Sequence, residues 1–160
     1  MENALESREM KVSKIRDGIV FDHLPAESSI KILKVLNLPA STSDSIISIL
    51  MNAHSSKYGK KDIIKVENLE LGKELIDRIF LVAPNATINF VKDYEIVEKR
   101  KSALPKSVLG IIKCKNPNCI TRKEQHAISK FSVIGNAPFL LKCDYCGQTI
   151  SSNEILDFLN

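Results

Sequence analysis

The chain lacks tryptophan, is poor in other aromatic residues, and contains no apolar run of membrane-spanning length. Its 160 residues include only three tyrosines and six phenylalanines, which argues against a surface that stacks the bases of single-stranded nucleic acid. Residues 1–9 carry charges where a signal peptide requires an apolar stretch. We therefore expect a cytoplasmic protein with no membrane partner.

Positive charge is in modest excess and is not gathered into one dense stretch. The 23 Lys and Arg residues exceed the 19 Asp and Glu residues, which gives a formal net charge of +4. The net charge is +1 over residues 1–103 and +3 over residues 104–160. Proteins that bind phosphate backbones usually carry a concentrated basic patch. We therefore expect no nucleic-acid partner.

Signatures of catalysis are also missing. The sequence has no G-x-x-x-x-G-K-[ST] loop to cradle the phosphates of a nucleotide substrate. The three histidines, His23, His54 and His126, lie in different contexts with no evident pairing of a nucleophile with a base. A nucleotide-using enzyme is accordingly the weakest functional class, and we expect no catalytic residues.

The last third of the chain contains four cysteines, spaced C-x4-C and C-x2-C: Cys114, Cys119, Cys143 and Cys146. Two short loops that each present a pair of thiolates can close a tetrahedron around one Zn²⁺. Because four thiolates leave no open position for water or substrate, such a zinc is structural rather than catalytic. Two disulfides are the alternative, which the lack of other features of a secreted protein disfavours.

The distribution of residue types predicts two domains. The cysteine-free part is rich in Ile, Leu and Val and can form a core of its own. The part from Leu104 onward is small, and a structural metal supplies the stability that so small a core lacks. A stretch of charged and small residues at 99–105 connects the two. We expect a disordered tail at 1–11, one domain at 12–103 and a zinc-binding domain at 104–160.

Hydrophobic periodicity predicts the elements of the first domain. One helix is expected from Ala26, with Ile30, Leu33 and Leu36 on its buried face. A second helix is expected from the spacing of Leu71, Leu75, Ile79 and Val82. Strands are expected at 19–21, 46–51, 62–67, 87–91 and 94–97, with a polar loop at 52–60.

The predicted order is β-α-β-β-α-β with an extra strand, which is typical of the ferredoxin-like fold. Two helices then cover one face of a mixed or antiparallel sheet and leave the other face free. An open face and an open edge need cover, so we expect a homodimer through the N-terminal domain. The second domain is expected to be small and mainly β, with strands at 108–113, 131–133 and 139–143 and a terminal helix at 153–159. The fold class is thus α+β.

Several separate motifs carry a resemblance to a known family. They are GIVFDHLP at 18–25, KDIIKVEN at 61–68 and APNATIN at 83–89, followed in order by YEIV at 94–97 and the four cysteines. Together they resemble the regulatory chain of aspartate carbamoyltransferase over residues 12 to about 150. The resemblance implies a non-catalytic subunit that regulates pyrimidine biosynthesis. It would bind CTP and ATP, with UTP as a further candidate, in its N-terminal domain and dock on the catalytic chain through its zinc domain.

The resemblance also implies a nucleotide site, at positions that match in this sequence: Val12, Lys14, Ile15, Val20, Asp22, Ile63, Lys65, Asn89, Val91, Tyr94, Ile96 and Lys99, with His23 at its border. Many of these residues lie two apart on a strand and therefore share a face. Lys65 and Lys99 would donate to ribose or phosphate oxygens, Asp22 would accept from a ribose hydroxyl, and the backbone around residues 14–15 would read the base edge. Lys99 is out of phase with Ile96, so its placement requires a bulge or a strand end.

These assignments have competing interpretations. Lys65 could be a solvated residue on an exposed strand, His23 could bond to backbone, Tyr94 could belong to the core, and residues 99–101 could form a solvated linker. For the whole chain, the principal alternative is a zinc-ribbon protein that binds nucleic acid. Zinc and the net positive charge favour it, but the sequence lacks the basic stripe and the aromatic platform that it requires.

Overall fold

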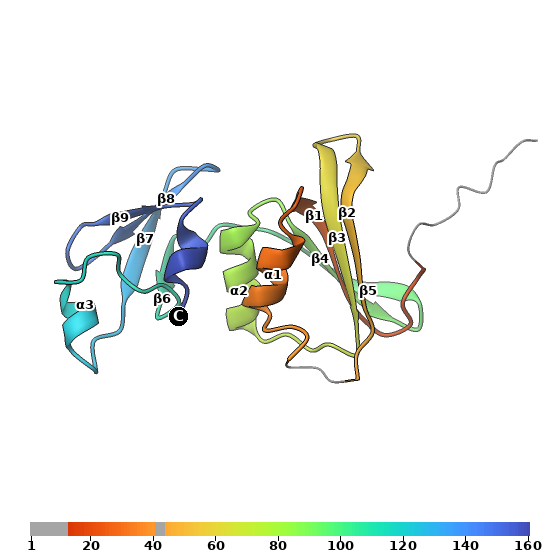
Figure 1. Ribbon diagram of the computed structural model, residues 1–160, viewed down its shortest axis with the longest axis horizontal. Coiled ribbons are helices and arrows are strands. Elements are labelled where there is room, and N and C mark those ends of the chain that lie inside the picture. Colours follow the sequence, from red (N-terminus) through yellow and green to blue (C-terminus); the bar gives the residue numbers. More distant parts are fainter. Residues whose placement is uncertain (1–12, 41–43) are drawn as a thin grey trace, which may run out of the picture.

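The computed structural model describes residues 13–40 and 44–160, which form two antiparallel sheets with separate hydrophobic cores (Figure 1). The helices α1 (Ser29–Val35) and α2 (Lys73–Val82) lie between the larger sheet and the smaller C-terminal unit. The α+β class and the small, mainly β C-terminal unit are as expected from the sequence. Val12 and the tail expected at 1–11 lie outside the described residues.

The N-terminal sheet has the strand order β2-β3-β1-β4-β5, and every neighbouring pair is antiparallel. Its strands are β1 (Gly18–Pro25), β2 (Ile47–Ser55), β3 (Gly59–Glu67), β4 (Thr87–Lys92) and β5 (Glu95–Lys101). With α1 after β1 and α2 after β3, this is the ferredoxin-like order with one strand added at an edge. On central β1, Ile19 and Phe21 are buried under the helices, whereas Val20 and Asp22 lie on the opposite face.

The first helix differs from the expectation in its start and in its buried face. It begins at Ser29 rather than at Ala26, because the chain first makes a turn in which Glu27 has a φ of 66°. Ile30, predicted to be buried, is 52% exposed, and Ile32 is fully buried instead. A distant residue sets this phase, since the buried Asp62 Oδ2 accepts from the Ser29 backbone N–H at 3.0 Å and from its hydroxyl at 2.7 Å.

The β2–β3 hairpin is longer than predicted. Only residues 56–58 connect the strands, and most of the polar loop expected at 52–60 belongs to them. A β-bulge between Leu50 and Ala53 contains Asn52, which has a φ of 58° and donates its backbone N–H to Asp62 Oδ1 at 2.9 Å. Main-chain pairing at a sheet edge does not depend on apolar side chains, so polar residues continue these strands.

The C-terminal sheet has the order β6-β7-β8-β9, made of β6 (Ser107–Leu109), β7 (Lys130–Ile134), β8 (Leu140–Cys143) and β9 (Thr149–Ser151). The strand predicted at 108–113 ends at Leu109, because Gly110 turns the chain with a φ of 70°. The predicted terminal helix is only a 3-10 turn, η1 (Ile155–Phe158), and neither β9 nor the short helix α3 (Ile120–Lys123) was expected. Elements of three or four residues are too short to show a period.

Helix α2 contacts both hydrophobic cores. Ile79 and Phe80 pack in the core of the N-terminal sheet, whereas Leu81 is fully buried among residues of the C-terminal unit. Arg78 adds a polar contact by donating to the backbone carbonyl of Asn160. The helix therefore ties the two units together. Within residues 13–40 and 44–160, no helix is long and apolar enough to cross a membrane.

Candidate functional sites

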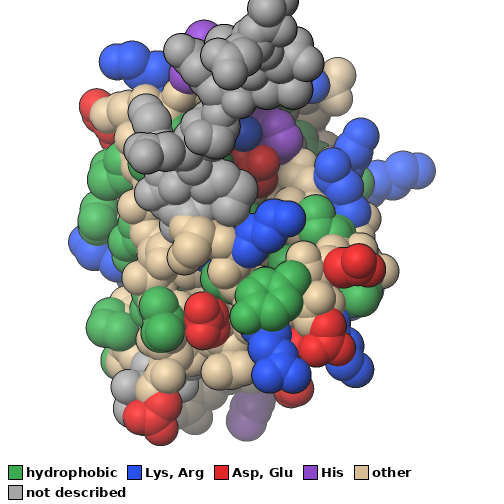
Figure 2. Space-filling view, turned by 90° about the vertical axis from the view of Figure 1, so that its right-hand side faces the viewer, with side chains coloured by type: hydrophobic (Ala, Val, Ile, Leu, Met, Phe, Trp, Pro, Cys, Tyr) green, Lys and Arg blue, Asp and Glu red, His purple; other side chains and the backbone are tan. Residues whose placement is uncertain are grey.

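The face of the N-terminal sheet that the helices leave open carries a continuous row of side chains. The strand registers align Lys65 of β3 with Val20 of β1, Val20 with Asn89 of β4, and Asn89 with Lys99 of β5. Aligned residues on neighbouring strands point to the same face. The sheet thus brings together four residues that the sequence assigns to one site. Figure 2 looks onto this side of the molecule, where basic, acidic and hydrophobic side chains are mixed.

A cavity of about 360 Å³ lies on this open face. Ten of the predicted nucleotide-site residues line it: Lys14, Ile15, Val20, Asp22, Ile63, Lys65, Asn89, Val91, Tyr94 and Ile96. They come from β1, β3, β4, β5, the turn before β5 and the segment before β1. Of the remaining three, His23 and Lys99 line a second cavity of about 300 Å³, and Val12 lies outside the described residues.

The segment before β1 forms one wall of the first cavity and is held at several points, of which two lie beside lining residues of the cavity. The Lys65 Nζ donates to the Ser13 carbonyl at 2.8 Å. The backbone N–H of Tyr94 donates to the Arg16 carbonyl at 2.9 Å. These contacts join β3 and the β4–β5 turn to the segment, so the wall has a defined position against the sheet.

Asp22 and its cationic neighbours lie where the two cavities meet. The Asp22 carboxylate is 2.9 Å from the Lys61 Nζ. Burial lowers the pKa of Lys65, an effect that the negative charge of Asp22 opposes. His23, which follows Asp22, has a φ of 55° at an irregularity of β1 and donates its backbone N–H to Asp22 Oδ1 at 2.6 Å. The paired carboxylate repels an anionic ligand less than an isolated one would.

Asn89 supplies a buried polar atom to the first cavity. The residue is 7% exposed, and its side-chain oxygen has no hydrogen-bond partner among the residues that the structure describes. A buried acceptor without a partner costs about 1–3 kcal/mol. Proteins retain such atoms mainly where water or a ligand completes them. An N–H or O–H donor of a bound molecule would satisfy this oxygen.

Lys99 reaches the open face because β5 contains a bulge. Phe90 and Val91 are consecutive on β4, but their partners on β5 are Glu98 and Ile96, so Val97 is the inserted residue. The insertion brings Lys99 back to the face of Ile96. The bulge that the out-of-phase spacing requires is therefore present.

The second cavity includes residues that sequence reasoning did not single out. Lys57 and Tyr58 from the β2–β3 hairpin and Lys101 from β5 line it together with His23 and Lys99. The sequence signal is a cluster of lysines around a tyrosine at 57–61. It was missed because the predicted hairpin loop was too long to place these side chains.

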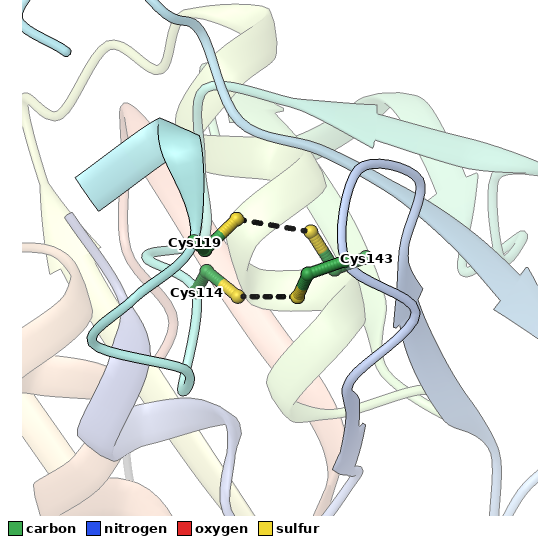
Figure 3. A group of neighbouring side chains, drawn as sticks. Cys114, Cys119 and Cys143 are labelled. Atoms are coloured by element: carbon green, nitrogen blue, oxygen red, sulfur yellow. Dashed lines mark hydrogen bonds between the residues drawn. The ribbon is translucent and has the colours of Figure 1, made fainter. Parts of the chain in front are cut away.

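The four cysteines converge from two loops of the C-terminal unit (Figure 3). Their Sγ atoms all lie within 4.8 Å of one another, with 3.5 Å between Cys114 and Cys146 and 3.8 Å between Cys119 and Cys143. Four sulfurs bound to one Zn²⁺ at about 2.3 Å are separated by about 3.8 Å in a regular tetrahedron. The cluster is therefore suited to hold one zinc ion, and the four cysteines form no disulfides.

The surroundings shift the pKa values of these thiols in different directions. Burial raises the pKa of Cys114 and of Cys143. Burial acts on Cys119 in the same sense, but hydrogen bonds with Thr121 outweigh it and lower the pKa of Cys119 to about 7. One thiolate is thus favoured within the cluster, and zinc must displace the protons of the other thiols when it binds.

Two family models match consecutive parts of the chain. The allosteric domain of the aspartate carbamoyltransferase regulatory chain matches residues 10–103, and the metal binding domain of that chain matches residues 106–156. This chain belongs to the aspartate carbamoyltransferase regulatory chain family. As a regulatory chain it is a non-catalytic subunit, and its four cysteines lie in the metal-binding domain, where they are suited to hold one zinc ion.

Individual relatives resemble the chain over almost its whole length. The aspartate carbamoyltransferase regulatory chain of Korarchaeum cryptofilum is 40% identical over 153 residues, which cover 95% of this chain and 97% of the relative. That of Pyrococcus abyssi is 45% identical over 148 residues, covering 92% and 97%. That of Methanothermobacter thermautotrophicus is 46% identical over 147 residues, covering 92% and 93%. The similarity therefore extends through both sheets.

Proposed function

We propose that residues 12–103 of this regulatory chain bind nucleotide effectors and that residues 104–160 dock on the catalytic chain of aspartate carbamoyltransferase. One observation carries the nucleotide assignment: ten residues that the family resemblance assigns to a nucleotide site line a single cavity. The cavity lies on a sheet face without helices and contains the side-chain oxygen of Asn89, which has no hydrogen-bond partner within residues 13–40 and 44–160. A concave, partly apolar site with a few converging polar groups is suited to a small ligand.

The chemistry of the walls gives the nucleotide an orientation. The backbone around Lys14 and Ile15 faces the base, because peptide N–H and C=O groups can pair with its edge. Asp22 accepts from a ribose hydroxyl, and Lys61 balances the charge of this carboxylate. The phosphates extend toward Lys99, where ammonium groups attract them. CTP and ATP are the expected effectors, with UTP as a further candidate.

The zinc centre supports the docking surface rather than taking part in a reaction. Four thiolates occupy every position of a tetrahedral zinc, so the ion fixes the loops that carry them. Ile120 follows Cys119 and is 52% exposed, and Tyr145 lies between Cys143 and Cys146 and is 54% exposed. We place the contact with the catalytic chain on this side, because large exposed apolar residues on rigid loops are typical of interfaces.

The β2 edge of the N-terminal sheet is the surface for a homodimer. Ile49 and Met51 on this edge are each 39% exposed. The opposite edge strand, β5, carries mostly charged residues and contains a bulge at Val97, two features that oppose pairing with another strand. A second copy of the chain is therefore expected to pair at β2.

The alternative of a nucleic-acid-binding zinc ribbon is not favoured, since the family match covers both parts of the chain. The unpaired cysteines fit a reducing compartment, which supports the expected cytoplasmic location.

The function can be tested by assembly with the catalytic chain of the same organism. The zinc-loaded regulatory chain should form a larger complex, measured by light scattering, and removal of zinc with a chelator should abolish it. CTP or ATP should then change the rate of the assembled enzyme at subsaturating aspartate. A zinc-loaded chain that forms no complex would contradict the docking role. If no nucleotide tested changes the rate of the assembled enzyme, the regulatory role would be contradicted.

A further inference from the structure

The second cavity on the open face is lined by cationic side chains from two sides. Lys99 and Lys101 come from β5, and Lys57 comes from the tip of the β2–β3 hairpin. Within the described part of the chain, no Asp or Glu lines this cavity. Ser102 Oγ, from one of its lining residues, has no hydrogen-bond partner among the described residues. His23 Nδ1 has none there either, but it lies 3.9 Å from the Asp22 carboxylate. Three ammonium groups and a hydroxyl donor are chemically suited to an anion.

This cavity continues the row of residues that forms the nucleotide site. Lys99 is aligned with Asn89 of the first cavity, and Lys101 is aligned with Thr87, which lines the second. Residues two apart on a strand are separated by about 7 Å, so the two cavities lie next to each other on the same face of the sheet. A ligand whose neutral end lies in the first cavity can therefore extend an anionic tail into the second.

The hairpin gives Lys57 a defined position. Ser55 Oγ accepts from the Tyr58 backbone N–H at 3.2 Å, and Gly59 completes the turn with a φ of 74°. The Lys57 Nζ lies 5.1 Å from the centroid of the Tyr58 ring, within the range of a cation–π contact. The Tyr58 ring in turn meets the His23 ring edge to face, with centroids 6.2 Å apart. Tyr58 thus links the lysine to the sheet.

We propose that Lys57, positioned by Tyr58, binds the terminal phosphate of a nucleoside triphosphate whose base and ribose occupy the first cavity. The inference rests on the nucleotide function proposed above. It adds that Lys57 makes the site distinguish nucleotides by the number of phosphates they carry. Lys99 and Lys101 line the second cavity from strand β5, whereas Lys57 lines it from the β2–β3 hairpin. A triphosphate extends far enough to contact both sides, and a monophosphate does not. The hairpin therefore favours triphosphates over monophosphates.

Calorimetry on the full chain with CTP and CMP tests this role. Lys57→Gln should weaken CTP binding about tenfold, the loss expected for one charge-assisted hydrogen bond, and should leave CMP binding unchanged. Lys60→Gln is the matched control, because Lys60 lies on the same hairpin and does not line the second cavity. Because Lys60 carries the same charge as Lys57, the comparison separates a direct contact of Lys57 with the phosphate from a general effect of charge on the hairpin.

Variants of Tyr58 separate the positioning of Lys57 from its charge. Tyr58→Phe keeps the ring and should retain the CTP affinity of the wild type. Tyr58→Leu removes the ring and should weaken CTP but not CMP. Circular dichroism checks that each variant is folded.

Several outcomes would overturn the proposal. An unchanged ratio of CTP to CMP affinity in Lys57→Gln would do so, as would equal losses in Lys57→Gln and Lys60→Gln, which would indicate a general charge effect. CTP binding that depends on Asn89 but not on Lys57 would refute the hairpin role alone. A wild-type chain that binds neither nucleotide would overturn both this role and the proposed nucleotide function.

Discussion

The ammonium group of Lys65 donates a hydrogen bond to the backbone carbonyl of Ser13 at 2.8 Å. This contact joins β3 to the segment before β1, and both sides of it contribute residues to the first cavity. Lys65 therefore holds a wall of the site and also presents a cation to it. Its pKa is lowered by burial, as expected for an ammonium group partly removed from water.

Replacement of Lys65 by alanine should weaken CTP and ATP binding about tenfold or more, because a charge-assisted hydrogen bond is lost and the wall is released. Lys99→Ala should have an effect of similar size. Lys92→Ala is the control, since Lys92 is exposed and lines neither cavity. Calorimetry on the purified chain measures these affinities. Wild-type affinity in both Lys65→Ala and Lys99→Ala would be inconsistent with the proposed site.

Replacement of Asn89 by leucine should separate binding from stability. The substitution removes a buried oxygen that has no partner among the described residues, so the free energy of unfolding should stay the same or rise by about 1 kcal/mol. Nucleotide binding should weaken, because the ligand loses its acceptor. Urea unfolding and calorimetry on the same samples check the two effects. A variant that is destabilised and binds normally would show that Asn89 is a structural residue.

Zinc binding should depend on pH through the thiols of the metal centre. The pKa of Cys119 is lowered to about 7, whereas burial raises the pKa values of Cys114 and Cys143. Zinc binds thiolates, so protons compete with it and its affinity should fall as the pH decreases from about 8 to about 6, because Cys114 and Cys143 are already protonated above about pH 7. Below about 7 Cys119 adds a further proton and the fall steepens. Competition with a chromophoric chelator between about pH 6 and pH 8 measures this trend. An affinity that does not change with pH would argue against thiolate ligands.

Asp62 should make the free energy of unfolding depend on pH. Burial tends to raise the pKa of its carboxyl, but hydrogen bonds from Asn52 and Ser29 outweigh burial and lower it. A lowered pKa in the folded state stabilises the protein above the ordinary value of 3.8, and this stability is lost as the pH falls through the folded pKa. Asp62→Asn should cost about 2 kcal/mol at pH 7, because the amide NH2 that replaces one carboxylate oxygen cannot accept from the buried donors that face it. Urea unfolding at pH 7 and near pH 3 should show a smaller acid loss in the variant than in the wild type.

Dimerisation should depend on the apolar β2 edge. Ile49→Lys places a charge in the proposed interface, and we expect a monomer by sedimentation at concentrations where the wild type is a dimer. Val97→Lys is the matched control, because Val97 is also an exposed apolar residue but lies on the opposite edge strand. A dimeric Ile49→Lys variant together with a monomeric Val97→Lys variant would place the interface at β5.

The spacing of residues two apart on a strand was sufficient to place Val20 with Asp22 on one face of β1, and Asn89 with Val91 on one face of β4, because side chains alternate along any strand. The family resemblance assigned both pairs to one site, and the register of β1 with β4 puts them on the same face. The same rule required a bulge before Lys99, and the register of β4 and β5 contains it. Cysteine spacing likewise predicted a closed metal site, because two short loops suffice to present four thiolates.

Periodicity failed where a distant group sets the local structure. The start of α1 depends on Asp62, which is far from Ser29 in sequence and binds its N–H and hydroxyl. Asp62 also holds the bulge at Asn52, and so lets β2 continue through polar residues. Leu81 appears in the sequence as one more apolar residue of a helix, yet it is buried in the core of the other unit.

The sequence by itself determined the order of the elements in the N-terminal sheet, its open face and the metal ligand set, because alternation, helical spacing and short loops are local properties of the chain. The tertiary structure decided the phase of α1, the length of the β2–β3 hairpin and the position of Lys57 opposite Lys99. Those features depend on contacts between residues far apart in sequence, and their pairing is fixed only when the strands align in register.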